Sequence, residues 1–437
     1  MSEPDRAAAG SGAGAGLPRW APSPREYDDL ALALDGILAE VTVAVPAGVV
    51  PDGNVTAELT AAELTDLEGT PVARLDVTVA AETAPGAWSL TGTVAPLRPR
   101  EDGVFRHLHR SPAQVRELLG SVDRSGGRAA AVVLDAPLDQ AALDRLADAV
   151  AGYDETVLLP LVGAGSPRGV SAHTLVRATL AAADLLPGQP LVVPVPLAAR
   201  TDAAADVALR DLVARAYGDP VRLAVEPTSG GGDGGYPAPI AAALGSSSRG
   251  TPQRGLVVFF TGLSGSGKST LARRLHDLVL ERGDRRVTQL DGDVVRRMLS
   301  AGLGFSRADR EANIARIGFV AAEVARHGGL AICAPIAPYA ATRAEVRRMV
   351  EAADGTFVLI HVSTPLAECE RRDRKGLYAK ARAGLIPEFT GISDPYEPPD
   401  DADLAIDTSD VTIDDAAAKV LGLLDERGLL SSPPPTP

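Results

Sequence analysis

The sequence lacks the features that would place it in several common classes of protein. It has two cysteines, Cys333 and Cys369, so we expect neither a disulfide framework nor a cysteine-based zinc site. It contains no run of about 18 apolar residues, which a membrane-spanning helix needs. Residues 1–16 lack the cationic start and apolar core of a secretory signal. These absences predict a protein of the reducing cytoplasm that does not associate with membranes.

Positive charge is also scarce, since 43 lysines and arginines stand against 57 acidic residues and leave a formal net charge of −14. Nucleic acids and membrane surfaces would be repelled by such a chain, so we expect neither as a partner. An anionic ligand must therefore meet a local cluster of basic residues. Aromatic residues make up only 4% of the chain, so the few that lie near a candidate site are informative.

The chain is longer than one compact core usually grows, so more than one domain is expected. Stretches that are rich in Gly, Ser and Pro, or poor in apolar residues, mark the boundaries. They predict disordered tails at 1–24 and 429–437 and a flexible linker at 228–253. Between them we expect a β-rich domain at 25–110, an α/β domain at 111–227 and a second α/β domain at 254–428.

In the last of these domains, apolar runs alternate with helical patterns. Strand-like runs lie at 256–260, 286–290, 330–334, 357–362 and 404–407, and helical patterns at 268–282, 309–327, 341–352, 366–372 and 412–427. This alternation is typical of a parallel sheet with crossover helices. The segment from Asp373 to Asp403 interrupts it, and a loop of that length is more often a functional lid than filler.

The first strand-like run of this domain leads into a glycine-rich loop. Residues 262–269, GLSGSGKS, fit G-x-x-x-x-G-K-[ST] between a strand and a helix. In such loops backbone N–H groups surround a phosphate, the lysine (here Lys268) reaches the β- and γ-phosphates, and the serine hydroxyl (here Ser269) binds Mg²⁺. The alternative is a flexible turn with a chance lysine. The residues expected to bind ATP are Gly262, Leu263, Ser264, Gly265, Ser266, Gly267, Lys268, Ser269 and Thr270.

Two carboxylates, Asp291 and Asp293, follow the second strand-like run. Open α/β sheets bind their ligands beyond the carboxyl ends of the strands. Carboxylates there can hold a hydrated Mg²⁺ or accept a proton from an attacking hydroxyl, and the sequence leaves open which residue does which. The alternative is that Asp293 only caps the helix that follows.

Four further residues, Arg296, Phe305, Arg310 and Asn313, suit an anionic substrate that carries a base. Arg310 and Asn313 are three residues apart, so they share one face of a helix. Two arginines and an amide can bind an anion, and Phe305 can stack on a base. Taken singly, each of the four also fits an ordinary exposed or core position.

Together these segments resemble the adenylylsulfate kinase family. The resemblance rests on GLSGSGKST, LDGDVVR, GFSRADREANIARIG, PYAATR, RDRKGLYAKARAG and FTGISDPYEPP, and covers residues 254 to about 428. It implies a P-loop NTPase-type parallel sheet with flanking helices. It also implies transfer of the γ-phosphoryl group of ATP to the 3′-hydroxyl of adenosine 5′-phosphosulfate (adenylylsulfate) in sulfate assimilation, with Mg²⁺. We expect a homodimer or a higher homo-oligomer, with sulfurylase subunits as a further candidate partner.

The resemblance also suggests the roles of individual residues. We expect Lys268, Asp291 and Asp293 to take part in catalysis, and Ser269 and Asp291 to hold the metal. The adenylylsulfate site would consist of Asp293, Arg296, Phe305, Arg310, Asn313, Ile336, Ala337, Lys375 and Phe389. Phe305 and Phe389 would hold the adenine between them, and Lys375 would lie on the lid. Several family members have serine at the position of Ala337, so a phosphoserine intermediate is excluded here.

The region before this domain resembles ATP sulfurylase, the enzyme that makes adenylylsulfate. The resemblance rests on LTDLEGTPVARLDVT at 64–78 and on VLLPLVGAGSPRGVSAHTLVRATLAA at 157–182. The catalytic motifs of sulfurylases are missing. Where sulfurylases have Gln-Thr-Arg-Asn-Pro, this chain has LDAPLDQ at 134–140. Where they have Gly-Arg-Asp-His-Ala-Gly, it has VEPTSG at 225–230.

Sulfurylase chemistry builds up negative charge and needs cationic donors, which Asp135, Asp139 and Glu226 would oppose. None of the six histidines forms the expected pair in the right segment. We therefore expect a non-catalytic sulfurylase-like region. Two alternatives remain, a bifunctional sulfurylase and kinase, and a nucleotide-binding regulator without turnover.

Overall fold

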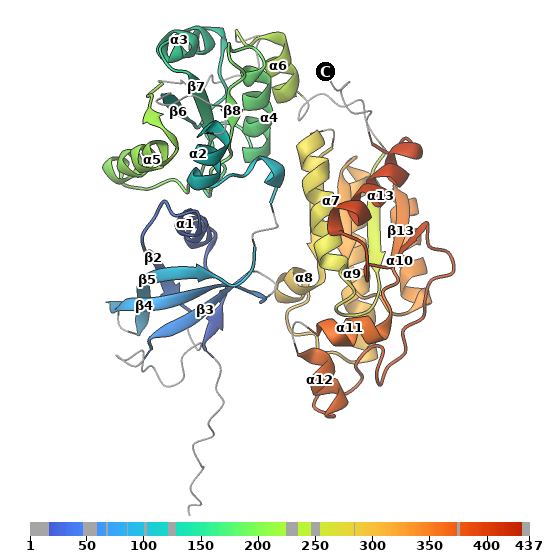
Figure 1. Cartoon of the computed structure of the whole chain (residues 1–437). Coiled ribbons are helices and arrows are strands. Elements are labelled where there is room, and N and C mark those ends of the chain that lie inside the picture. Colours follow the sequence, from blue (N-terminus) through green and yellow to red (C-terminus); the bar gives the residue numbers. More distant parts are fainter. Residues whose placement is uncertain are drawn as a thin grey trace, which may run out of the picture. The chain divides into compact units, whose positions relative to one another are not determined.

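The computed structural model describes residues 17–46, 59–66, 69–84, 86–99, 103–120, 128–223, 235–245, 254–283, 285–373 and 376–430 (Figure 1). The chain forms two compact units, residues 1–34 with 38–100, and residues 35–37 with 101–437. Within the second unit, two parallel sheets each have a hydrophobic core of their own.

The first unit is a mostly antiparallel sheet with one helix. Its elements are β1 (Arg19–Trp20), α1 (Pro24–Leu34), β2 (Val41–Val45), β3 (Ala61–Thr65), β4 (Pro71–Ala84) and β5 (Ala87–Pro96), and the strand order is β1-β3-β4-β5-β2. In β2, Val41 and Val43 are buried while Thr42 and Ala44 are exposed, as the period of two in a strand requires. The β-rich character expected here is confirmed.

The ends of the predicted tails are ordered, which differs from the expectation. Residues 1–16 and 431–437 lie outside the described residues. Trp20 is buried in the core of the first unit, and β1 pairs with β3. Leu430 is buried in the core of the last domain. Both side chains are large and apolar, so burying them outweighs the cost of ordering a few residues.

The first parallel sheet of the second unit has the strand order β8-β7-β6-β9. The strands are β6 (Ala129–Leu134), β7 (Glu155–Pro160), β8 (Leu191–Val192) and β9 (Asp219–Pro220). The helical elements are η2 (Arg106–Leu108), α2 (Pro112–Gly120), α3 (Gln140–Val150), α4 (Ala172–Ala183), α5 (Ala203–Tyr217) and α6 (Ala238–Gly245). Helix α6 lies inside the stretch 228–253 that was expected to be a flexible linker. It is ordered because Ile240 is completely buried in the core of this sheet.

The second parallel sheet, in the last domain, has the strand order β11-β12-β10-β13-β14. Its strands are β10 (Leu256–Thr261), β11 (Val287–Asp291), β12 (Leu330–Ala334), β13 (Thr356–Val362) and β14 (Leu404–Ile406). Its helices are α7 (Lys268–Arg282), α8 (Gly292–Met298), α9 (Arg307–Arg326), α10 (Ala340–Ala352), α11 (Leu366–Arg372), α12 (Leu377–Arg382) and α13 (Ile413–Glu426). The strands and helices predicted for this domain are confirmed, and their ends agree to within two residues.

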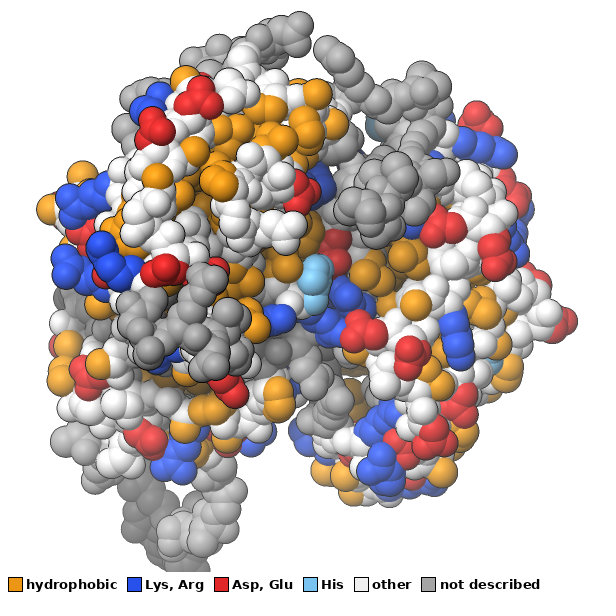
Figure 2. Space-filling view, turned by 45° about the horizontal axis from the view of Figure 1, so that its top comes forward, with side chains coloured by type: hydrophobic (Ala, Val, Ile, Leu, Met, Phe, Trp, Pro, Cys, Tyr) orange, Lys and Arg blue, Asp and Glu red, His pale blue; other side chains and the backbone are white. Residues whose placement is uncertain are grey.

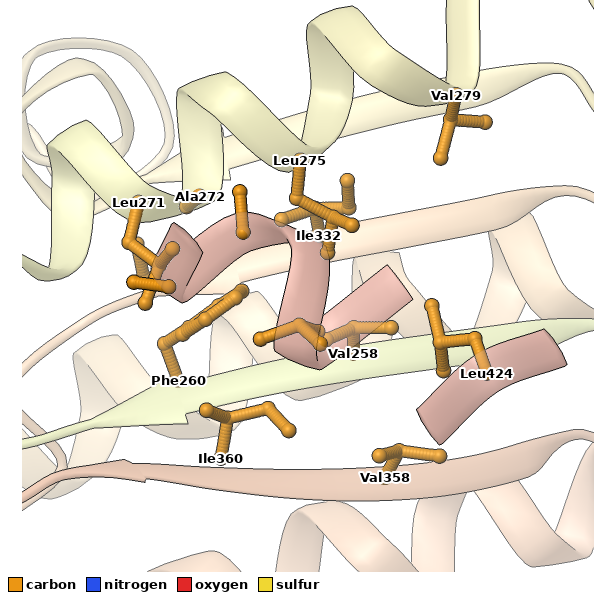
Figure 3. Close-up of a cluster of buried hydrophobic side chains, with 14 of the residues drawn as sticks. Val258, Phe260, Leu271, Ala272, Leu275, Val279, Ile332, Val358, Ile360 and Leu424 are labelled. Atoms are coloured by element: carbon orange, nitrogen blue, oxygen red, sulfur yellow. The ribbon is translucent and has the colours of Figure 1, made fainter. Parts of the chain in front are cut away.

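Alternate side chains of this sheet fill two different cores. Val258 and Phe260 of β10 pack with Leu271 and Leu275 of α7 on one face, where Leu424 of α13 joins them (Figure 3). Val257 and Phe259 face the other way, towards helices α9 and α10. A strand that is buried on both faces reads as a continuous apolar run, which explains LVVFF.

Because all neighbouring strands of this sheet run parallel, their carboxyl ends meet at one edge. The glycine-rich loop leaves β10 there, Asp291 ends β11, and Pro335 follows β12. These three segments can therefore contribute residues to one site at this edge of the sheet.

No helix in the described part of the chain is long and apolar enough to span a bilayer. On the face seen in Figure 2, acidic and basic side chains of the described residues are interspersed.

Shortening a core side chain tests this architecture. Leu275 is 0% exposed, so Leu275→Ala should lower the free energy of unfolding of the last domain by about 2–5 kcal/mol. Urea unfolding followed by circular dichroism measures it. Leu385→Ala is the matched control, since Leu385 is 72% exposed.

Both tryptophans, Trp20 and Trp88, lie in the first unit, so their fluorescence reports on that unit alone. We expect Leu275→Ala to leave the fluorescence transition in place while the circular dichroism transition moves to lower urea. Equal shifts in the two signals would contradict the separate cores.

Candidate active site

The loop between β10 and α7 requires glycine for two physical reasons. A Cβ at Gly262 would lie 2.4 Å from the Val362 carbonyl oxygen, so a side chain cannot be accommodated. Gly267, directly before the helix, has a φ of +95°, which L residues with side chains rarely adopt. The close approach to β13 and the tight turn into α7 give the loop the shape that the sequence motif predicts.

The lysine of the loop is held inside it. Lys268 is buried, and its Nζ donates to the Leu263 carbonyl at 2.6 Å and to the Ser266 hydroxyl at 3.4 Å. Helix α7 begins at Lys268, so its first-turn N–H groups face the same space as the ammonium group. This arrangement can bind a phosphate group.

Two threonines from the neighbouring strand ends hold the loop from behind. Thr364 and Thr408 both donate to the Ser266 carbonyl oxygen, at 3.1 and 2.9 Å. Their hydroxyl groups lie 2.9 Å apart, and Arg372 donates to the Thr408 hydroxyl at 2.8 Å. All of these contacts except that of the arginine are buried, so the position of the Ser266 carbonyl is fixed.

The first of the two candidate carboxylates ends β11. Asp291 is buried, and it pairs in register with Ala334 of β12. Helix α8 begins at Gly292, so Asp293 lies in the first turn rather than before it. The structure thus gives Asp291 the position directly before the helix.

Arg310 is buried and bound to three polar groups. It forms an ion pair with Asp394 and donates to the Thr390 hydroxyl at 3.2 Å and to the Tyr339 hydroxyl at 3.4 Å. Tyr339 in turn donates to Asp394 at 2.8 Å. Residues of α9, of the loop after β12 and of the segment after α12 therefore meet at one buried cation.

Asn313 lies one helical turn from Arg310 and is 4% exposed. Within the described part of the chain, its Oδ1 atom accepts no hydrogen bond. A buried amide oxygen without a donor is costly, so the site gains when a ligand supplies an N–H group. The amino group of an adenine is such a donor.

Arg296 and Phe305 lie against each other. The guanidinium carbon of Arg296 is 4.5 Å from the centre of the Phe305 ring, and its Nη1 donates to the Gly304 carbonyl at 2.9 Å. Phe305 is 63% exposed, so one face of its ring is covered by the arginine while much of the side chain stays accessible. A base can stack on the accessible side.

The loop after β12 is tied to the end of β10. The Thr261 hydroxyl donates to the Ile336 carbonyl at 2.6 Å, and Arg343 donates to the Ala337 carbonyl at 2.9 Å. Ala337 has a φ of +44°, an unusual value for a residue with a side chain. The contacts on both sides of the loop hold it in this conformation.

Residues 373–399, here called the lid segment, contain α12 and the Thr390–Asp394 bridge. Phe389 is half-buried, and its ring meets that of Tyr378 edge-on, with centroids 5.1 Å apart. The Tyr378 hydroxyl donates to the Ser264 carbonyl at 2.8 Å. Lys375 lies outside the described residues, and the side chain of Asp293 is not described.

Several residues of this site were not predicted from the sequence: Thr364, Thr408, Tyr378, Tyr339 and Asp394. A signal existed for the two threonines, since both follow the end of a strand, as Asp291 does. None existed for Tyr378 or Asp394, because their partners lie 114 and 84 residues away in the sequence.

The sulfurylase-like region differs from the expectation in its charge. Asp135 accepts hydrogen bonds from Arg168 at 3.0 and 3.1 Å and from Arg210 at 2.8 Å. Burial alone would raise the pKa of Asp135, but the bonds from these arginines outweigh it and hold the pKa below its usual value. Asp139 caps α3 by accepting from the Ala142 N–H at 2.7 Å. The two arginines therefore neutralise Asp135, which would otherwise repel an anionic ligand. Glu226 lies outside the described residues.

Comparison with known proteins gives a match for the last domain. Residues 254–407 match the family model of adenylylsulphate kinase. The adenylyl-sulfate kinase of Halothermothrix orenii is 46% identical over 181 residues, which are 41% of this chain and 95% of that protein. The sulfate adenylyltransferase of Phaeosphaeria nodorum is 50% identical over 179 residues, which are 41% of this chain and 31% of that protein. The chain thus spans about a third of the length of the sulfate adenylyltransferases it matches.

Among solved structures, the Mycobacterium tuberculosis APS kinase CysC in complex with AMPPNP and APS is 48% identical. The match covers 40% of this chain and 99% of that one, with a TM-score of 0.39.

The buried pair of Arg310 and Asp394 makes a testable contribution to stability. Asp394→Asn leaves the arginine buried beside a neutral partner, so the free energy of unfolding should fall by about 1.5–3 kcal/mol. Urea unfolding followed by circular dichroism measures this. Glu311→Gln is the control, because the pair of Glu311 with Arg307 is on the same helix but exposed. Equal effects of the two changes would contradict the buried pair.

The ion pairs of Asp135 predict a pH dependence. Its pKa is lowered on folding, so its contribution to stability is present above the unfolded value of about 3.9 and is lost as the pH falls through the folded value. Asp135→Asn should therefore destabilise the protein at pH 7, and the difference from wild type should shrink as the pH falls below about 4. Urea midpoints measured at pH 7, 5 and 3.5 test this. Asp219→Asn, which alters an exposed pair with Arg128, serves as the control. A difference that grows on acidification would refute the assignment.

Proposed function

Since the chain belongs to the adenylyl-sulfate kinase family, whose members are phosphotransferases, we propose that it transfers the γ-phosphoryl group of ATP to the 3′-hydroxyl of adenylylsulfate. The product is 3′-phosphoadenylylsulfate. The observation that carries this proposal is that the last domain contains two groups of buried polar residues that suit anionic nucleotides. The loop around Lys268 is one, and the buried pair of Arg310 and Asn313 is the other.

ATP binds with its phosphates in the loop of residues 262–269. The ammonium group of Lys268 leaves the Leu263 carbonyl for the β- and γ-phosphates, where it offsets the charge of the transferred group. The N–H groups at the start of α7 add to this positive potential. The chain as a whole is acidic, so these fixed local donors supply the attraction for ATP.

Mg²⁺ suits the donors present. The Ser269 hydroxyl and the Asp291 carboxylate are hard oxygen ligands of the kind that this ion prefers. No group of three or more His, Cys, Asp or Glu residues that could hold a metal occurs among the described residues. Ser269 and Asp291 would therefore hold a Mg²⁺ ion that arrives together with the nucleotide. When bound, it neutralises charge between the β- and γ-phosphates.

Adenylylsulfate binds beside Arg310. Asn313 accepts from the adenine amino group, Phe389 and Phe305 stack on the base, and Arg296 turns from the Phe305 ring to the sulfate or phosphate group. Asp394 neutralises Arg310 in this structure, so the anion competes with a carboxylate of the chain itself. Ile336, Ala337 and Lys375 complete the proposed site.

In the transfer step the 3′-oxygen attacks the γ-phosphorus while the bond from that phosphorus to the bridging oxygen of ADP breaks. The proton of the hydroxyl passes to a carboxylate, either that of Asp291 at the end of β11 or that of Asp293 in the first turn of α8. Little covalent chemistry is required of the protein, so the main tasks of the residues are to align the two nucleotides and to exclude water. The lid segment serves the second task.

We propose that the sulfurylase-like region does not catalyse the formation of adenylylsulfate. The two arginines that the structure brings to the edge of its sheet are occupied by Asp135, and no histidine lies in the stretch 134–140. The name of the Phaeosphaeria relative favours the alternative, a bifunctional enzyme. Incubation of the full chain with ATP and sulfate separates the two, because only the bifunctional enzyme releases pyrophosphate.

Removal of the loop lysine tests the proposed reaction. The full chain should form 3′-phosphoadenylylsulfate from ATP and adenylylsulfate, and Lys268→Ala should reduce kcat by about 10²-fold or more, because the charge that stabilises the transferred group is lost. Lys419→Ala, at an exposed position on α13, should keep wild-type activity. Chromatography of the product measures the activity of the wild type and of both variants. A wild-type protein that makes no product at saturating substrates would refute the proposed function.

A further inference from the structure

Tyr378 connects the lid segment with the phosphate-binding loop. It lies in α12, is 3% exposed, and donates its hydroxyl hydrogen to the Ser264 carbonyl at 2.8 Å. Burial raises the pKa of Tyr378, so the hydroxyl stays protonated and acts as a donor. The backbone of α12 is itself fixed, since the N–H groups of Tyr378 and Ala379 donate to the Asp373 carboxylate at 3.1 and 2.9 Å.

The direction of the Ser264 carbonyl has a consequence for phosphate binding. In a trans peptide the C=O group and the following N–H group point in opposite directions in one plane. The Ser264 carbonyl points towards the Tyr378 hydroxyl, so the Gly265 N–H points away from Tyr378. Thr364 and Thr408 fix the Ser266 carbonyl in the same way, since both donate a hydrogen bond to it.

The ring of Tyr378 touches a different part of the site. It meets the Phe389 ring edge-on, at 77°. The residue after Phe389, Thr390, bonds to Arg310, and the Phe389 carbonyl accepts from the Asp394 N–H at 3.1 Å. Tyr378 therefore contacts the ATP loop with its hydroxyl and the proposed acceptor site with its ring.

A second contact joins the same two segments without a hydrogen bond. A Cβ at Gly391 would lie 2.9 Å from the Leu263 Cδ2 atom, so the loop side chain packs directly on the backbone of the lid segment. This contact excludes water from the junction but has no direction. Among the described residues of the two segments, the Tyr378 hydroxyl supplies a directional contact, its bond to the Ser264 carbonyl.

We propose that Tyr378 is a positioning residue that couples the two nucleotide sites, since its hydroxyl orients the Gly265 N–H for an ATP phosphate and its ring holds Phe389 for the acceptor base. This rests on the proposed function for the identity of the acceptor. The ATP half depends only on the loop geometry and is tested separately.

Two substitutions separate the hydroxyl from the ring. Tyr378→Phe removes one hydrogen bond and keeps the ring, so the Kd for ADP and the KM for ATP should both rise by about 2- to 10-fold while the KM for adenylylsulfate stays unchanged. Tyr378→Leu removes both contacts and should in addition raise the KM for adenylylsulfate by about 2- to 10-fold. The control is Tyr153→Phe. The Tyr153 hydroxyl accepts a hydrogen bond from Arg128, and both residues are far from Tyr378 in the sequence.

Isothermal titration with ADP gives the Kd, steady-state kinetics give both KM values, and thermal unfolding gives the midpoint of each variant. Wild-type ADP affinity and KM for ATP in Tyr378→Phe would overturn the proposal. The proposal would also be overturned if Tyr378→Phe lowered the unfolding midpoint and kcat but left both KM values unchanged. That pattern is expected of a purely structural role. If the wild type binds ADP but forms no product, the proposed function fails, whereas the ADP titration of Tyr378→Phe still decides the role of the hydroxyl.

Discussion

The orientation of two peptide planes in the phosphate-binding loop is the constraint on which the site depends. Thr364 and Thr408 donate to the Ser266 carbonyl, and Tyr378 donates to the Ser264 carbonyl, so each peptide plane is held by a side chain from another segment. These side chains come from the ends of β13 and β14 and from α12. The loop is therefore shaped by the sheet edge that surrounds it, while its glycines only permit that shape.

A second constraint is charge, because the chain as a whole is acidic and a cation buried within it must be stabilised. Arg310 is buried, and the ion pair with Asp394 and the hydroxyl groups of Thr390 and Tyr339 offset the cost of its burial. The Oδ1 atom of Asn313, one helical turn away, accepts no hydrogen bond within the described part of the chain. In the sulfurylase-like region, Arg168 and Arg210 are likewise bound to an internal carboxylate, that of Asp135. Both domains thus stabilise arginine side chains through a carboxylate of the chain itself.

The sequence predicted the fold of the last domain well because its central strands bury both faces and its longer helices bury one. Such segments carry strong periodic signals, and the ends of the elements agree closely. It predicted the segments around residue 240 poorly, since α6 is short and is surrounded by Gly, Ser and Pro. Its order depends on Ile240, whose contacts in the core cannot be read from the local pattern. The same holds for Trp20 in the expected tail.

The sequence by itself predicted the phosphate loop and the carboxylates after β11, because their chemistry is contained in short segments with a fixed spacing. The complete residue set of the proposed acceptor site came from the resemblance to a known family. Only the tertiary structure decided how these groups are held. Asp394 reaches Arg310, Tyr378 reaches Ser264, and Asp135 meets its arginines across many tens of residues. Parallel strands and crossover helices bring such distant residues to one edge, and a hydrogen bond depends on distance in space rather than on separation along the chain.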